Sequence, residues 1–138
     1  AEGDSRIIAG LEAEDTQRMR NCIRDLGIPI IEGPESWVIR GGSTPRFGCS
    51  LNTGASGTTL RFLLPWLALA AREPVRFQGD PRLFERPLGG LVNALRSVGA
   101  SWEALPAGGV LCPAPARPQR LDLEVDPSAS SQFLTGLA

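Results

Sequence analysis

Two stretches of the sequence place small polar residues directly before an apolar, helix-like run. They are NTGASGTTLRFLL at 52–64 and DPSASSQFLTGLA at 126–138. The first turn of a helix carries unpaired backbone N–H groups at the positive end of the helix dipole, which suits a phosphate or a carboxylate. Gly57 would allow close approach, and the hydroxyls of Ser56, Thr58, Ser130 and Ser131 would add donors. An ordinary Ser/Thr helix cap remains the alternative for each stretch.

A third stretch, GDPRLFERP at 79–87, places an arginine where helix stability alone would not. Arg86 directly precedes Pro87, at an expected helix start, and a cation there opposes the helix dipole. A bound anion would offset the repulsion between the Arg86 cation and the positive end of the helix dipole. The alternative is that Arg86 forms an ion pair with Glu85 or another surface carboxylate.

Composition narrows the chemistry. All 14 basic residues are arginine, and lysine, histidine and tyrosine are absent, so this chain offers no His or Tyr acid–base catalyst and no Lys Schiff base. A P-loop is excluded because it requires lysine. The net charge of −1 gives no basic field for nucleic acid. The longest apolar run, FLLPWLALAA, is too short to span a bilayer, so no membrane partner is expected.

The three cysteines, Cys22, Cys49 and Cys112, have wide spacings and no CxxC pair. We expect reduced thiols in a cytoplasmic protein, without a disulfide or a metal site. The first residues are charged, unlike a signal peptide, and no initiator Met is present. We therefore expect this chain to be a piece of something longer.

The elements that must position these residues recur along the chain. A helix is expected over 14–27, with Asp15 or Thr16 as its cap and Gly27 at its end, followed by strand-like runs IPIIEG and SWVIRG around a Gly33-Pro34 turn. Shifted by 72 residues, the run RPLGGLVNALRSVG and the strands SWEAL and GVLCPA repeat this order. The strands SRIIAG and PVRFQG precede the two helices. The pattern predicts a duplicated unit: strand, loop into helix, strand, helix, strand, strand.

The repeat divides the chain into three parts. Residues 1–43 are expected to end unit one, 44–116 to form a complete unit two, and 117–138 to begin unit three. The two hydroxyl-bearing loops then occupy equivalent places, since Leu60 aligns with Leu134 at an offset of 74.

Three segments, LNTGASGTTLRFLLP, GDPRLFERPLGGLVNALRSVGA and SASSQFLTGLA, resemble in order and spacing the enolpyruvyl transferases, most closely the 5-enolpyruvylshikimate-3-phosphate (EPSP) synthase family. The resemblance covers essentially the whole chain, as a fragment of the N-terminal domain. It implies an α+β fold of repeated βαβαββ units, three per domain, in an inside-out α/β barrel that is incomplete here. It also implies transfer of the enolpyruvyl group of phosphoenolpyruvate to the 5-hydroxyl of shikimate 3-phosphate in aromatic amino acid biosynthesis, with release of phosphate and without a metal or organic cofactor.

The resemblance assigns roles to individual residues. Arg86 would bind phosphoenolpyruvate, Ser130 and Ser131 would hold the phosphate of shikimate 3-phosphate, and Gln132 would contact both substrates. Gly57 and Thr58 would border the phosphoenolpyruvate and glyphosate site. Arg61 would have a structural role. The family usually has Asn at the position of Ala55 and often Pro at that of Phe62, which leaves glyphosate sensitivity open.

The resemblance places no catalytic residue in this chain. The family's acid–base groups belong to an N-terminal motif and a second domain, so we expect the isolated chain to be inactive and to need the remainder of the enzyme as its partner. An incomplete domain should expose apolar surface, including Leu60, Leu63 and Leu64, and self-association is one outcome. Two alternatives stay open: a non-catalytic phosphometabolite-binding or assembly module of the same fold, and a UDP-N-acetylglucosamine enolpyruvyl transferase. An RNA-end-processing cyclase would require a catalytic histidine, which is absent.

Overall fold

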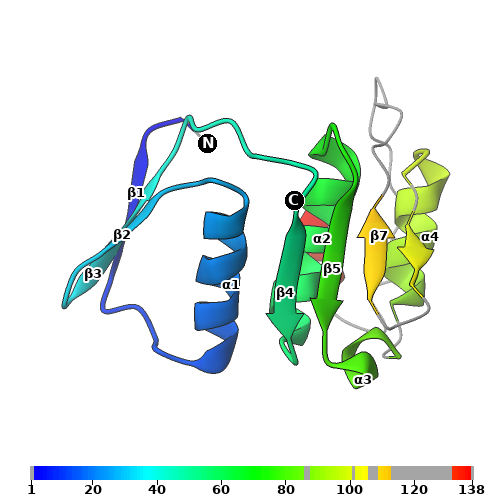
Figure 1. The fold of residues 1–138 in the computed structure, drawn as a ribbon, viewed down its shortest axis with the longest axis horizontal. Coiled ribbons are helices and arrows are strands. Elements are labelled where there is room, and N and C mark those ends of the chain that lie inside the picture. Colours follow the sequence, from blue (N-terminus) through cyan, green and yellow to red (C-terminus); the bar gives the residue numbers. More distant parts are fainter. Residues whose placement is uncertain (1, 86–87, 101, 106–108, 113–131, 138) are drawn as a thin grey trace.

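The computed structural model describes residues 2–85, 88–100, 102–105, 109–112 and 132–137. Helices and strands alternate along the chain in an α+β arrangement (Figure 1). In chain order the elements are β1 (Asp4–Ile8), α1 (Glu14–Asp25), β2 (Ile30–Glu32), β3 (Ser36–Arg40), β4 (Ser50–Gly54), α2 (Gly57–Ala70), β5 (Val75–Gly79), α3 (Pro81–Phe84), α4 (Gly89–Ser97), β6 (Glu103–Ala104), β7 (Val110–Cys112) and α5 (Gln132–Leu137).

The strands form two sheets that repeat one topology. The first sheet has the order β1-β3-β2 and is antiparallel, and the second has the order β4-β5-β7-β6, in which only the β4–β5 pair is parallel. Strands β5, β7 and β6 therefore repeat β1, β3 and β2. The registers also correspond, because Val38 lies between Arg6 and Ile31 and Val110 lies between Phe77 and Ala104. This arrangement supports the duplicated unit, whereas the unit boundaries at 43/44 and 116/117 stay predictions.

Equivalent glycines end the two equivalent helices. Gly27 follows α1 with φ +77° and Gly99 follows α4 with φ +82°, a left-handed conformation that favours glycine. The start of α1 differs from the prediction. Its cap position is Ala13, and Thr16 lies inside the first turn, where its hydroxyl accepts from the Ala13 N–H at 3.1 Å. Neither Asp15 nor Thr16 is the cap, because α1 begins at Glu14, two residues before the first helical position that an Asp15 cap would give.

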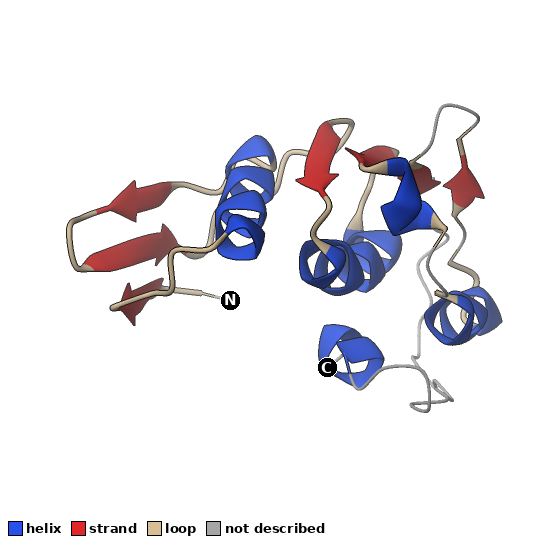
Figure 2. Cartoon of the chain, turned by 90° about the horizontal axis from the view of Figure 1, so that it is seen from below, coloured by secondary structure: helices blue, strands red, loops and turns tan. Residues whose placement is uncertain are grey.

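Helices α2 and α4 cover one face of the four-stranded sheet, and α5 lies beyond α2 (Figure 2). Helix α1 lies between the three-stranded sheet and β4 (Figure 1). The core forms where α2 and α4 meet the four-stranded sheet, and it includes Phe77, Leu51, Leu67, Leu91 and Val110, each at most 1% exposed.

The expected exposure of Leu60, Leu63 and Leu64 is wrong. Leu60 and Leu64 are 0% exposed and Leu63 is 6% exposed, because α2 has apolar neighbours around most of its circumference. Among the described residues, the large apolar side chains that do reach solvent lie mainly on the three-stranded sheet and its loops, and they are Ile7, Ile8, Leu11, Ile31 and Trp66. No helix in the described segments has the length and apolar character needed to cross a bilayer.

Candidate functional site

The turn between β4 and α2 is held by its own polar groups. The Asn52 side chain accepts from the Gly54 N–H at 3.0 Å, and the Thr53 carbonyl accepts from the Ser56 N–H at 2.9 Å. Gly54 has φ +55°, which suits glycine. These contacts fix the direction in which α2 leaves the turn, with Gly57 as the first helical residue.

Ser56 is the cap of α2, and its hydroxyl is used inside the protein. Its Oγ accepts from the Thr59 N–H at 3.1 Å and donates to Thr59 Oγ1 at 2.8 Å; Thr59 Oγ1 in turn donates to the Asp15 carbonyl at 3.2 Å. Ser56 is 1% exposed and Thr59 is 0% exposed. The expectation that Ser56 offers a donor to an anion is therefore wrong: this hydroxyl stabilises the helix start and ties α2 to α1.

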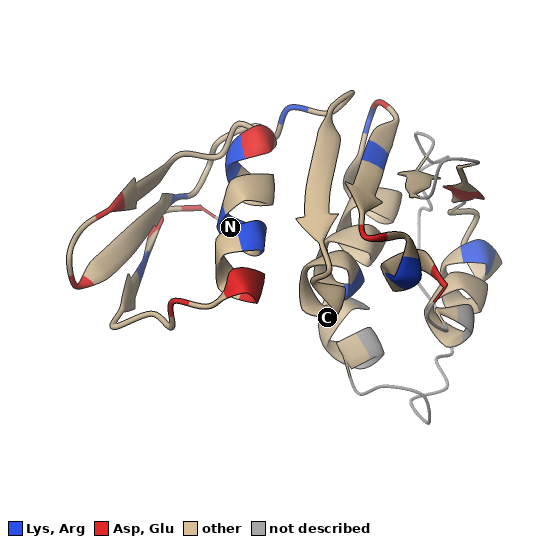
Figure 3. Cartoon of the chain, turned by 60° about the horizontal axis from the view of Figure 1, so that its bottom comes forward, with Lys and Arg blue, Asp and Glu red and all other residues tan. Residues whose placement is uncertain are grey.

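The amino-terminal turn of α2 carries uncompensated positive charge. Within the described residues, the backbone N–H groups of Gly57 and Thr58 have no hydrogen-bond partner, and the first turn of the helix has no acidic residue. Charged residues are spread over α1 and the strands around it, while α2 is almost without charge (Figure 3). Its one charged residue is Arg61, which lies a single turn from the start, where a cation adds to the positive end of the dipole. This end of α2 suits an anion.

Arg61 connects α2 to α5. Its Nη1 donates to Gln132 Oε1 at 3.0 Å, and a Cβ on Gly136 would lie 2.6 Å from the Arg61 carbonyl oxygen and 3.0 Å from Pro65 Cγ. Arg61 and Pro65 follow each other along α2 as Gln132 and Gly136 do along α5, so the two helices run in the same direction. The start of α5 thus lies beside the second turn of α2, which brings Gln132 to the same end as Gly57 and Thr58.

The described residues cover only some of the predicted site. Gly57, Thr58, Arg61 and Gln132 are described, and they gather at this end of α2. Arg86, Ser130 and Ser131 lie outside the described residues. Upstream of Arg86, Asp80 caps the short helix α3 by accepting from the Arg82 N–H at 2.9 Å, and the sequence patterns above did not predict this helix.

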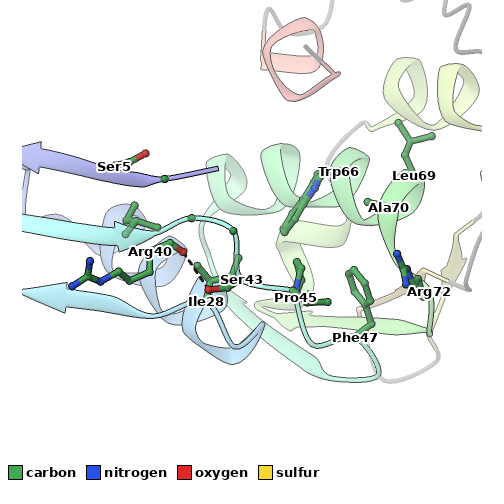
Figure 4. A pocket seen from close by; sticks show the side chains of 15 residues that line it. Ser5, Ile28, Arg40, Ser43, Pro45, Phe47, Trp66, Leu69, Ala70 and Arg72 are labelled. Carbon is green, nitrogen blue, oxygen red and sulfur yellow. Dashed lines mark hydrogen bonds between the residues drawn. The ribbon is translucent and has the colours of Figure 1, made fainter. Parts of the chain in front are cut away.

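Two hollows border α2 but differ in position. One, of about 300 Å³, lies between α1, the three-stranded sheet and the first turns of α2, and Thr58, Phe62 and Met19 are among its mostly apolar lining. The other, of about 630 Å³, is lined by Trp66, Leu69 and Arg72 near the opposite end of α2 (Figure 4). Trp66 lies nine positions after Gly57 along α2, a rise of roughly 14 Å, so the larger hollow is not the predicted anion site.

The cysteines have the character of structural thiols. Burial raises the pKa of Cys22 to about 11, with a smaller effect from Asp25, and burial raises the pKa of Cys112 to about 12. Burial also raises the pKa of the half-exposed Cys49. All three thiols are free, and no group of three or more potential metal ligands occurs in the part of the chain that the structure describes.

No sequence pattern singled out a buried arginine on the side of α1 that faces the three-stranded sheet. Arg20 is 7% exposed, and its guanidinium lies 3.9 Å from the Trp37 ring centroid. Glu12 accepts from it at 2.9 and 2.6 Å, and Glu32 lies 2.9 Å away. The hydrogen bond from Arg24 is the main cause that lowers the pKa of Glu32. This network joins α1 to both its preceding loop and the three-stranded sheet, so we assign it a structural role.

The family model described as EPSP synthase (3-phosphoshikimate 1-carboxyvinyltransferase) matches residues 1–138. The chain belongs to the EPSP synthase family. A 3-phosphoshikimate 1-carboxyvinyltransferase of Nostoc punctiforme is 39% identical over 105 residues, which cover 73% of this chain and 24% of that protein. The enzyme of the same name from Nitrosomonas europaea is 37% identical over 144 aligned positions, covering 99% of this chain and 33% of that protein.

Solved structures share the fold. Two structures of EPSP synthase from Acinetobacter baumannii match with TM-scores of 0.75 and 0.80, at 27% and 29% identity. Each match covers 99% of this chain and 32% of the solved chain. The α+β fold expected from the sequence is confirmed, and the chain spans about a quarter to a third of the EPSP synthases that it matches.

Proposed function

We propose that residues 1–138 form part of the substrate-binding half of an EPSP synthase. The complete enzyme would transfer the enolpyruvyl group of phosphoenolpyruvate to the 5-hydroxyl of shikimate 3-phosphate and release phosphate. Family membership supports the reaction class, and the end of α2 supports the binding of anionic metabolites.

One observation carries the proposal: at the amino-terminal end of α2, backbone N–H groups lack acceptors and the positive charge lacks a negative partner among the described residues. The Gly57 and Thr58 N–H groups lack acceptors among the described residues, and neither α2 nor α5 has an acidic residue in its first turn. The Arg61 guanidinium adds a fixed positive charge one turn away. A phosphate or carboxylate would supply the acceptors and the negative charge that this end lacks.

The remaining roles follow the family resemblance. Gln132 would contact both substrates, while Ser130 and Ser131 would hold the phosphate of shikimate 3-phosphate. Arg86 would bind phosphoenolpyruvate as a fixed-charge fork. Gly57 and Thr58 would border the phosphoenolpyruvate site, where an inhibitor such as glyphosate would also bind.

The proposed site residues that the structure describes, Gly57, Thr58, Arg61 and Gln132, are binding groups, and none of them is a carboxylate. Proton transfer would come from the remainder of the enzyme, whose closure over the substrates would exclude water and complete the site. We therefore expect no phosphate release from phosphoenolpyruvate and shikimate 3-phosphate by residues 1–138 alone. Turnover by this polypeptide in a coupled phosphate assay would refute that division of roles.

Calorimetric titration tests the binding itself. The complete polypeptide that carries residues 1–138 should bind shikimate 3-phosphate and should bind unphosphorylated shikimate much more weakly. Ser131→Ala should weaken binding of the phosphorylated ligand by about tenfold, because it removes a hydrogen bond to a charged group. Arg86→Ala should weaken phosphoenolpyruvate in the same way, whereas Arg96→Ala, at an exposed position on α4, is the matched control.

Equal affinity for shikimate with and without its phosphate would refute the proposal. Retained binding of shikimate 3-phosphate together with absent turnover in the complete polypeptide would favour the non-catalytic module of the same fold.

A further inference from the structure

The bond between Arg61 and Gln132 fixes which end of the Gln132 amide faces a ligand. The guanidinium group has donors but no acceptor, so only the oxygen of the amide can face it. Arg61 Nη1 meets Gln132 Oε1 at 3.0 Å. The amide nitrogen must therefore point away from Arg61.

The position of Arg61 is itself restrained by the crossing of α2 and α5. Its carbonyl lies against Gly136, whose missing Cβ would be only 2.6 Å from that oxygen. Its side chain is half-buried, and its Nε is buried and has no hydrogen-bond partner among the described residues. Arg61 thus touches two successive turns of α5, with its backbone on Gly136 and its guanidinium on Gln132. With its backbone fixed against Gly136 and its guanidinium bonded to Gln132, Arg61 has little freedom to release the amide.

We propose that Arg61 is a positioning residue: it orients Gln132 so that the amide nitrogen donates to an anionic oxygen of the substrate. The inference rests on the proposed function, since the ligand is the phosphorylated metabolite bound at this end of α2. It also fixes which part of the Gln132 amide faces the ligand. Gln132 then presents its N–H groups to ligand oxygens that accept a hydrogen bond, while Arg61 engages its own oxygen.

A double-mutant cycle tests this coupling in the complete polypeptide that carries residues 1–138. Shikimate 3-phosphate is titrated into the unmodified protein, Arg61→Met, Gln132→Ala and the double variant. Arg61→Met should weaken binding by about tenfold when Gln132 is present, because the amide is free to turn its oxygen toward the anion. In the Gln132→Ala background the same change should weaken binding clearly less, because only the attraction between the Arg61 charge and the anion is then lost. Arg61→Lys keeps a cationic donor and should restore part of the lost affinity.

The side-chain amide signals of Gln132 give a readout that needs no ligand. They are assigned by their loss in Gln132→Ala, and they should shift in Arg61→Met and stay in place in Arg96→Met, a matched arginine change on α4. Thermal unfolding of each variant verifies that it folds.

Two results would overturn the inference. One is an equal loss of affinity from Arg61→Met with and without Gln132, which would mean that Arg61 acts on the ligand independently. The other is an unchanged Gln132 amide spectrum in a folded Arg61→Met variant. Failure of the unmodified protein to bind shikimate 3-phosphate instead refutes the proposed function, while the amide spectrum still decides whether Arg61 holds Gln132.

Discussion

The Ser56 hydroxyl could either stabilise the start of α2 or bind an anionic ligand, and the Ser56→Ala substitution distinguishes these two roles. The substitution removes the cap of α2, a loss of typically about 1 kcal/mol. It also removes the hydrogen bond that Ser56 donates to the buried Thr59 hydroxyl at 2.8 Å, which contributes about another 1 kcal/mol. Thr59 keeps its bond to the Asp15 carbonyl, so the losses stop there.

The expected total is a fall of about 2 kcal/mol in the free energy of unfolding. Unfolding entropy scales with length, so this loss lowers the melting temperature of a chain of this size by roughly 7 °C. The affinity for shikimate 3-phosphate should change by less than about twofold when it is measured well below that temperature, because Ser56 is 1% exposed and its hydroxyl is engaged internally.

Differential scanning calorimetry and ligand titration make the two measurements on one sample. Ser43→Ala is the matched control, since its hydroxyl makes a single long contact of 3.5 Å to the Arg40 carbonyl, and little change is expected. A Ser56→Ala protein with an unchanged melting temperature and clearly weaker ligand binding would refute the reasoning, because the hydroxyl would then serve the ligand and not the helix.

Three further predictions concern packing, acid stability and thiol reactivity. Gly136→Ala should cost about 1–3 kcal/mol in urea unfolding, because its Cβ would meet the Arg61 carbonyl oxygen at 2.6 Å; no loss would mean that α5 does not pack this closely. Glu32 has a lowered pKa in the folded state, so its ion pairs stabilise the fold at neutral pH, and this contribution is lost as pH falls through the folded pKa. In urea unfolding, Glu32→Gln should therefore be less stable than the unmodified protein at neutral pH and should lose less stability in acid, whereas parallel pH profiles of the two proteins would contradict this. Alkylation at neutral pH should label Cys49 ahead of the other two cysteines, and mass spectrometry should find all three labelled only after denaturation; early labelling of Cys22 would contradict its burial.

The sequence predicted the elements well where their signals are local. Apolar periodicity placed α1 and α4, and the shift of 72 residues anticipated that β5, β7 and β6 repeat β1, β3 and β2. Helix α3 was missed because its single turn is too short for periodicity, although Asp80-Pro81 carries a cap signal that could have found it.

What the sequence could not decide was the direction in which a side chain points. A serine before a helix is equally suited to cap it or to bind an anion, and only the buried bonds of Ser56 to Thr59 separate these roles. The Arg61–Gln132 bond joins residues 71 positions apart. The Arg20 network likewise depends on the tertiary fold, which brings Glu12, Glu32 and Trp37 to one guanidinium.

Pro65 gives the contact between α2 and α5 an unusual chemical origin. Proline lacks an N–H, so it cannot donate to the carbonyl four residues earlier, which is that of Arg61. That oxygen points at Gly136, where a Cα hydrogen occupies the place of a side chain and can form a weak C–H···O contact. A proline-to-alanine change would repair the internal ladder of α2 while drawing this oxygen back into its own helix. Strengthening one helix in isolation would thus loosen its hold on the neighbour that carries Gln132.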